Sequence, residues 1–361
     1  MDPAAKKPPF KKNLLSTQID LSKFALATEE EKIQHDIMGE STTFLRDGMR
    51  KLSKNRLAMA SLVVLILIVI SIIIVPHIIP YGYEQMITVD GVRDKSAANL
   101  HPFQYSILEQ QYMAENGEKL FPHILGTDHL ARDYAIRVIY GTRVSLLVGF
   151  FASLIVLLVG LVYGSVSGYL GGKVDLIMMR FVDIIYSLPD LLMIILLQVV
   201  LDQTINKFIM GVPLLAKLGT NMISIFIVFG LLYWVTMARL VRGQILSIKE
   251  NEYVMAARAV GSGTGRTIRK HILPNCISVI IIATALQIPA AIFTESFLSF
   301  ISLGVQAPMP SLGSLANAAR EGLQSHAYKL IFPAAMICLI VLAFNLLGDG
   351  LRDAFDPKLR R

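Results

Sequence analysis

Residues 57–83 read LAMASLVVLILIVISIIIVPHIIPYGY and contain no Asp, Glu, Lys or Arg. A second run without charge, residues 144–172, reads VSLLVGFFASLIVLLVGLVYGSVSGYLGG. About 20 apolar residues in a helix cross the hydrocarbon layer of a bilayer, because each residue advances the helix by about 1.5 Å. A buried helix of a soluble protein rarely needs so long a stretch without charge. Both runs therefore predict membrane-spanning helices.

The whole chain fits this interpretation. It has 361 residues, of which 54% are hydrophobic and only 17% are charged, whereas soluble domains carry about 25% charged residues. The first apolar run follows a polar stretch and has no small-residue cleavage site, which indicates a retained span. We predict an all-α polytopic membrane protein with six transmembrane helices, at 57–80, 143–166, 183–202, 222–242, 276–300 and 330–348.

Basic residues set the expected orientation. The net charge is +7, and Lys and Arg gather beside apolar spans, where they determine topology and meet anionic lipid. With six spans, three basic segments fall on one face, which should be cytoplasmic together with both termini; they are 46–56, 242–270 and 352–361.

This orientation divides the chain into four parts. Residues 1–43 form a polar cytoplasmic tail, and 44–142 hold an amphipathic helix on the membrane surface, the first span and an enlarged extracellular loop. Residues 143–352 form a core of five helices, and 353–361 a cytoplasmic C-terminal tail. In the second span, Gly160, Gly164 and Gly168 share one helix face, which predicts close packing of another helix.

The sequence offers little for catalysis. The run GSGTGRT at 261–267 lacks the Lys and the spacing of a phosphate-binding loop. The seven histidines form no metalloprotease or hydrolase motif, and Cys276 and Cys338 lie in or beside apolar spans without disulfide or metal-site spacing. No aromatic-rich basic patch suggests nucleic acid. We expect no enzyme activity, no cofactor and no metal in this chain.

Two acidic residues lie at membrane depth. Ionisable groups there usually face the protein interior or water. Asp190 follows Pro189, which interrupts the third span, and Glu295 lies in the outer part of the fifth. Each could line a translocation path, or contact a buried polar group or a companion subunit. For Glu295 we favour the structural role.

The segment between spans four and five has helical content of its own. Residues 250–260 are good helix formers, with acids at the start and Arg258 near the end, and Gly261 is a suitable stop. A second short helix is predicted at 264–271, after which Pro274 opens span five. Such an ordered loop suits docking into a groove of another protein. A solvated basic loop is the alternative, and the pattern alone leaves both open.

This loop resembles the EAA loop of ABC importer permeases. The resemblance rests on Glu252-Tyr253-Val254-x-Ala256-Ala257-Arg258-Ala259-x-Gly261 and His271-Ile272-Leu273-Pro274-Asn275. It is greatest for the C-subunit branch of the dipeptide/oligopeptide (nickel) type. Other stretches similar to that branch include Leu125-Gly126-Thr127-Asp128, Arg132-Asp133, Gly141-Thr142-Arg143-x-Ser145-Leu146, Ala238-Arg239-x-x-Arg242-Gly243, Glu295-Ser296-x-Leu298-Ser299-Phe300 and Phe344-Asn345-Leu346-x-Gly348-Asp349. The chain departs from the pattern at His129-Leu130-Ala131, where Leu-Gly is usual, and at Leu312, where Trp is usual.

The resemblance implies a type I ABC importer permease fold, with the EAA loop at 250–275 as a cytoplasmic coupling helix. It further implies that this loop seats in a cleft on an ATPase, through Glu252, Tyr253, Ala256, Ala257, Arg258, Gly261 and Pro274. ATP and Mg would be bound by two separate ATPase subunits. A second, homologous permease would complete a heterodimer, and an extracellular peptide-binding protein would dock on the outer loops.

The implied function is translocation of di- or oligopeptides into the cytoplasm across the cell membrane. Import of nickel or another small cargo shares this architecture and stays open. A self-sufficient ion-coupled carrier or channel belongs to a different class. We disfavour it because the sequence has neither repeated broken helices nor paired membrane charges.

Overall fold

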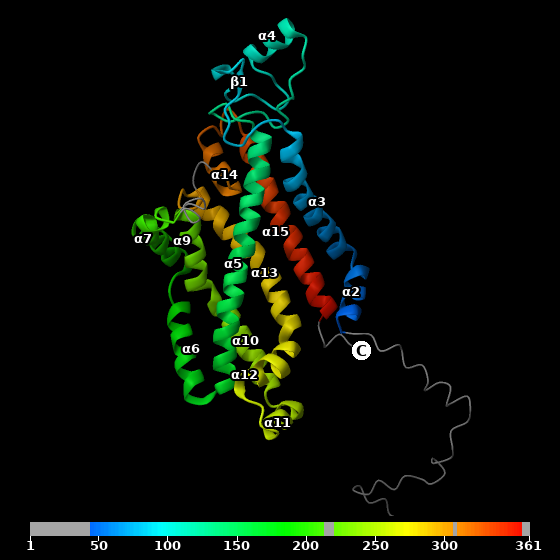
Figure 1. Ribbon diagram of the computed structural model, residues 1–361, viewed down its shortest axis with the longest axis vertical. Coiled ribbons are helices and arrows are strands. Elements are labelled where there is room, and N and C mark those ends of the chain that lie inside the picture. The colour runs from blue at the N-terminus through cyan, green and yellow to red at the C-terminus, as the bar shows by residue number, and fades with distance from the viewer. Residues whose placement is uncertain (1–43, 213–219, 306–308, 356–361) are drawn as a thin grey trace, which may run out of the picture. The chain divides into compact units, whose positions relative to one another are not determined.

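The computed structural model describes residues 44–212, 220–305 and 309–355. The chain divides into two units, Met1–Asp47 and Gly48–Arg361. The fold described below is that of the second unit, a bundle of long helices (Figure 1). The predicted tail at 1–43 and the last residues of the predicted C-terminal tail lie outside the described residues.

Within the described ranges, five helical segments are long and apolar enough to cross a membrane. Three are single helices, namely α3 (Arg56–Ile78), α5 (Tyr134–Leu170) and α15 (Tyr328–Phe355). One joins α9 (Thr220–Val228), the π-helix η3 (Phe229–Tyr233) and α10 (Trp234–Ile248), and another joins α12 (Thr264–Thr267), the π-helix η4 (Ile268–Ile272) and α13 (Leu273–Phe300). A sixth crossing is made if the bent pair α6 (Gly172–Tyr186) and α7 (Asp190–Met210) counts as one span.

The third predicted span, 183–202, is wrong as a single helix. The chain bends by 89° between α6 and α7, and the break falls at Ser187–Pro189. Proline lacks the N–H that an α-helix requires, and its ring disfavours helical geometry in the residue before it. The first four residues of the predicted span therefore belong to α6, residues 187–189 form the break, and residues 190–202 belong to α7.

Several predicted boundaries are too narrow. Helix α5 begins at Tyr134, before the predicted 143, and α15 continues to Phe355, beyond the predicted 348. At 37 residues α5 is about 55 Å long, so it exceeds the hydrocarbon thickness of about 30 Å. Charged residues in its first turns, such as Arg137 and Arg143, ended the charge-free window without ending the helix.

The amphipathic helix predicted at 44–56 is confirmed as a helix, α2 (Phe44–Lys54). Asn55 separates it from α3, and its side-chain Oδ1 accepts a hydrogen bond from Ala58 N at 3.2 Å. Leu52 and Ala58 pack in one buried cluster with Ala354 of α15. The start of α3 and the end of α15 therefore lie at the same end of the bundle.

Contacts along α5 define the two ends. At its start, the Tyr134 hydroxyl donates to the carbonyl oxygen of Lys329, the second residue of α15, at 2.7 Å. At its finish, the carbonyl oxygen of Gly168 accepts from Lys249 Nζ, just after α10, at 3.1 Å. We call the first the loop end and the second the α11 end, after the short helix α11 (Glu252–Ala259) that follows α10. The start of α3, the 242–270 segment and the end of α15 share the α11 end (Figure 1), as expected for the three basic segments.

The predicted close packing on the glycine face of α5 is confirmed, and the partner helix is α10. A Cβ atom at Gly160 would lie 2.6 Å from Met237 Cβ, and one at Gly164 would lie 2.4 Å from the carbonyl oxygen of Ala238. Real Cβ atoms do not approach other atoms so closely, so only glycine lets the two backbones meet.

Residues 79–133 form a compact segment at the loop end, which we call the 79–133 loop. It contains the antiparallel pair β1 (Thr88–Val89) and β2 (Val92–Arg93), the 3₁₀-helix η2 (Lys95–Ala97) and α4 (Ile107–Asn116). Asp90 and Gly91 connect the strands with positive φ angles of 50° and 77°, as a tight hairpin requires. A further short helix at this end, α14 (Leu312–Arg320), precedes α15.

Candidate functional site

The predicted docking helix is α11 (Glu252–Ala259), which lies at the α11 end. Asn251 precedes it in an extended conformation, with Glu252 in the first turn and Arg258 in the last. Both charges suit the helix dipole. Val254 is fully buried, in the apolar cluster that also contains Ile245 and Ile272. One apolar side chain therefore fixes α11 against the ends of its neighbours.

The stop predicted at Gly261 is confirmed, and its geometry is a Schellman motif. Gly261 has a φ angle of 89°, which favours glycine because other residues meet steric strain there. Its N–H donates to the carbonyl of Arg258 at 2.9 Å, and the N–H of Ser262 donates to the carbonyl of Ala257 at 3.0 Å. Thr267 then closes the following turn, since its buried hydroxyl lies 3.1 Å from the Gly263 carbonyl oxygen.

Two contacts connect α11 and its preceding turn to the end of α5. The Nε of Arg258 donates to the Tyr169 hydroxyl at 3.2 Å, and the guanidinium carbon lies 4.7 Å from the centroid of the same ring. Lys249 Nζ binds the Gly168 carbonyl. These contacts attach α11 and the turn before it to the helix that runs the length of the bundle.

Apart from Val254 and the half-buried Ala257, α11 is exposed. Tyr253 and Met255 are 43% and 52% exposed, and Val260 after the helix is 90% exposed. Glu252 and Ala256 are exposed as well. Exposed apolar residues gathered on one ordered element mark an interaction surface, so the arrangement suits docking more than catalysis.

Ion pairs connect α6 to α10 at the α11 end of the bundle. Asp175 of α6 accepts from both Nε and a terminal nitrogen of Arg242 on α10, each at 2.5 Å, and from the Ser167 hydroxyl of α5 at 2.5 Å. A second pair joins Arg239 to Asp183 at 2.7 Å, but these side chains are 37% and 51% exposed. The bidentate pair therefore contributes more to the junction of α5, α6 and α10 than the exposed one does.

The structure brings most of the predicted coupling residues together. Six of them lie on α11 or its terminating turn, namely Glu252, Tyr253, Ala256, Ala257, Arg258 and Gly261. Pro274 is exposed at the start of α13 and follows the π-helix η4, whose wider turn accommodates a residue without an N–H. Tyr169 and Lys249 were not predicted, because their partners are 89 and 81 residues away in sequence.

Glu295 and Asp190 lie elsewhere. Glu295 is fully buried and accepts from the hydroxyls of Ser145 on α5, at 2.8 Å, and Ser299 on α13, at 2.7 Å. The Ser145 oxygen also accepts from Leu312 N of α14 at 3.3 Å. Glu295 thus joins three elements inside the chain. Asp190 begins α7, and its side chain lies outside the described part of the structure.

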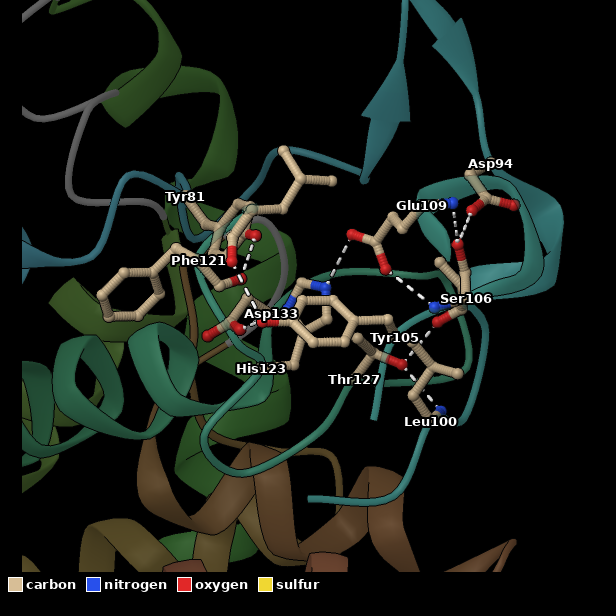
Figure 2. Close-up of polar contacts among 12 residues, drawn as sticks. Tyr81, Asp94, Leu100, Tyr105, Ser106, Glu109, Phe121, His123, Thr127 and Asp133 are labelled. Carbon is tan, nitrogen blue, oxygen red and sulfur yellow. Dashed lines mark hydrogen bonds and ion pairs between the residues drawn. The ribbon is translucent and has the colours of Figure 1, made fainter. Parts of the chain in front are cut away.

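At the loop end, a buried histidine bridges two acids (Figure 2). The Nδ1 of His123 lies 2.9 Å from Asp133 Oδ2, and its Nε2 lies 3.0 Å from Glu109 Oε1. Burial lowers the pKa of His123, but the hydrogen bonds from its protonated ring to Asp133 and Glu109 outweigh burial and raise the pKa to about 9. His123 is therefore charged at neutral pH and links α4 to the start of α5.

The same network fixes both partners of His123. Glu109 and Ser106 form a capping box at the start of α4, and the Ser106 hydroxyl donates to Asp94. Asp133 caps α5, because its Oδ1 accepts from Ile136 N at 3.0 Å. Asp133 of the predicted motif therefore has a structural role, because it holds the 79–133 loop on α5 through His123.

Comparison with known proteins gives two family matches. The family described as binding-protein-dependent transport system inner membrane component matches residues 157–361. The family described as N-terminal TM domain of oligopeptide transport permease C matches residues 43–102.

Curated relatives match along nearly the whole chain. The dipeptide transport system permease protein DppC of Bacillus subtilis is 40% identical over 94% of this chain and 93% of its own. The oligopeptide transport system permease protein OppC of the same organism is 37% identical over 93% and 96%, and that of Escherichia coli is 36% identical over 91% and 96%. Among solved structures, a crystal structure of an amino acid ABC transporter with histidines covers 60% of this chain and 92% of its own, with a TM-score of 0.42 and 17% identity.

Proposed function

Because this chain belongs to the family of inner membrane components of binding-protein-dependent transport systems, we propose that it is the C-type permease subunit of a peptide importer and that α11 receives the force of ATP hydrolysis. As a member of this family, it is a multi-pass membrane protein and a transport component rather than an enzyme. The proposed cargo is a di- or oligopeptide, the substrate class in the names of the relatives.

The observation that carries the proposal is the setting of α11. One buried valine and the Arg258–Tyr169 contact attach it to the bundle, while its remaining surface is open. Two ATPase subunits that bind ATP and Mg would grip this surface, so that their closure displaces α11 and, through Tyr169, tilts α5. A second permease chain and an extracellular peptide-binding protein complete the proposed complex.

The residues proposed to contact the ATPase are those exposed on α11 and its terminating turn, and Pro274 is proposed to preserve the connection to α13. We propose that the α11 end is cytoplasmic, which supports a cytoplasmic location for both termini. The wealth of basic residues at that end is the supporting observation. We also propose that Asp190 lies on the translocation path.

The test replaces one exposed carboxylate of α11 by a cation. In the purified complex reconstituted in liposomes, Glu252→Lys should lower ATP-dependent dipeptide uptake by about tenfold. A tenfold change lies within the range that the coupling free energy between two sites of a protein typically produces. The ATPase subunits should still hydrolyse ATP. Gly261→Val should act similarly, since its φ angle of 89° strains a branched residue.

The matched control is Glu118→Lys, the same change at an exposed position of the 79–133 loop, which should leave the coupling ratio unchanged. Unaltered uptake in both α11 variants would refute the proposed role of α11. A parallel uptake assay with nickel tests the cargo, because saturable nickel transport without dipeptide transport would refute peptide import while leaving the coupling role intact.

A further inference from the structure

A cavity of about 310 Å³ lies at the loop end, apart from α11. One wall is the turn before α5 and the first turns of α5, including Asp128, Arg132 and Arg137. The opposite wall is α14 and the start of α15, including Lys329. These side chains take no part in the proposed coupling role of α11 or in the His123 network.

The walls of this cavity carry unbalanced charge. The side chains of Arg132, Arg137 and Lys329 are nearly buried, and Asp128 is the one acidic side chain with comparable burial among those that line the cavity. Asp128 is already engaged, because it accepts from Arg132 Nε at 2.7 Å and from two backbone N–H groups. Glu321 also lines the cavity but is exposed, so solvent screens its charge.

Two of the three cations lack an acidic hydrogen-bond partner in the described part of the chain. Lys329 Nζ donates to the neutral side-chain oxygen of Asn99 at 2.5 Å. Arg137 donates to the Tyr83 carbonyl at 3.3 Å, whereas its Nε lies 3.6 Å from Asp128 Oδ2 and makes no hydrogen bond. A buried cation without its full set of partners is costly, so the cavity is built to receive negative charge.

We propose that this cavity binds a carboxylate group. Arg137 lines the cavity, and the two terminal nitrogens of a guanidinium form a planar fork that matches two carboxylate oxygens. Lys329 supplies a second positive charge from the opposite wall. The carboxylate could come from the C-terminus of a peptide or from an acidic side chain of a docked protein. The anion site follows from the charges alone, whereas the peptide source rests on the proposed function.

One departure from the family pattern lies at this cavity. His129 stands in the motif where Leu-Gly is usual, and its exposed side chain lines the cavity. An acidic residue at this position would supply a carboxylate from within the chain. Position 129 therefore offers a surface substitution that can fill the site without removing a buried residue.

The experiment measures thermal unfolding of the complex, purified with the full-length chain and without the extracellular receptor. Sodium acetate is titrated against sodium chloride at equal ionic strength. Acetate should raise the unfolding temperature saturably. In Arg137→Gln and Lys329→Gln, its dissociation constant should rise by about tenfold, the cost of one charged hydrogen bond. Arg143→Gln, an exposed position on the same helix, should bind acetate like the wild type.

A second variant tests the site without removing a buried side chain, so its result does not depend on whether the Arg137 and Lys329 variants fold. His129→Glu should unfold at a higher temperature than wild type without acetate and should no longer respond to acetate, whereas His129→Gln should respond normally. If acetate acts no differently from chloride on the wild type, or acts equally on His129→Glu, the carboxylate site is refuted. Tighter binding of inorganic phosphate than of acetate would also refute the assignment.

Further binding measurements distinguish the two sources of the carboxylate group. If dialanine binds more tightly than acetate while dialaninamide does not bind, the source is a peptide terminus. If dialanine is no better than acetate, and acetate weakens docking of the purified receptor, the source is a receptor side chain. None of these measurements needs transport, so they can fail while peptide import holds, and the reverse is equally possible.

Discussion

At the scale of single residues, His123 shows how burial and charge oppose each other. Its side chain is fully buried, a setting that favours the neutral ring, yet each ring nitrogen faces a carboxylate oxygen within 3.0 Å. Only the protonated ring donates from both nitrogens. The ring of Tyr81 lies beside His123, tilted by 33° with its centroid 4.8 Å away, and the Tyr81 hydroxyl donates to the Phe121 carbonyl oxygen.

This arrangement predicts a loss of order in the 79–133 loop at alkaline pH. The folded-state pKa of His123, about 9, exceeds its unfolded value near 6.5. The stabilisation is therefore complete below about pH 6.5 and disappears as the pH rises through 9; its full size is on the order of 3 kcal/mol. Hydrogen exchange of α4 amides, corrected for intrinsic rates, should accelerate between pH 7 and 10.

His123→Gln should already exchange rapidly at pH 7 and lose most of this pH dependence. His129→Gln, at an exposed position of the same loop, should keep the wild-type profile. An equally steep profile in His123→Gln would show that another group is responsible.

At the scale of elements, the contact of α5 with α10 depends on the absence of side chains. Gly164→Ala would place its Cβ 2.4 Å from the Ala238 carbonyl oxygen and 2.9 Å from Val241 Cβ. Both are parts of a helix that cannot yield locally, so the helices must separate. We expect a stability loss of about 1–3 kcal/mol, seen as a lower unfolding temperature.

Gly243→Ala is the matched control, because a Cβ at that position of α10 meets no atom within 4 Å. It should unfold at or slightly above the wild-type temperature, since alanine favours helices. Equal losses in the two variants would contradict a packing cause.

Much of this arrangement could be predicted from the sequence. Charge-free runs identified the spans that contain α3 and α5, and four-residue glycine spacing identified the packing face of α5, because both are local patterns. The identity of α10 as its partner could not be predicted, nor could the contacts of Tyr169 or Arg137, because the chain brings distant segments together. The break before α7 was visible in Pro189, but its 89° bend depends on how the flanking helices pack.

At the scale of the whole molecule, α5 is long enough to cross a membrane, and α11 and the 79–133 loop contact its opposite ends. We therefore predict that α11 and the 79–133 loop lie on opposite sides of the membrane. Val260→Cys and Ile107→Cys, at positions 90% and 66% exposed, test this in a chain whose Cys276 and Cys338 are replaced by alanine. An impermeant maleimide should label Val260→Cys only in inside-out vesicles and Ile107→Cys only in right-side-out vesicles. Labelling of both from one side would overturn the topology.

One uninterrupted helix, α5, carries Arg137 near its first turn and Tyr169 near its last. A stiff rod that pivots in the bilayer moves its two tips in opposite directions, so the tips cannot be set independently. If a partner at each tip prefers one inclination of this rod, each partner changes the affinity of the other by the same factor. The inclination of α5 would then depend both on what is bound at its outer tip and on the nucleotide state of the ATPase subunits at its inner tip.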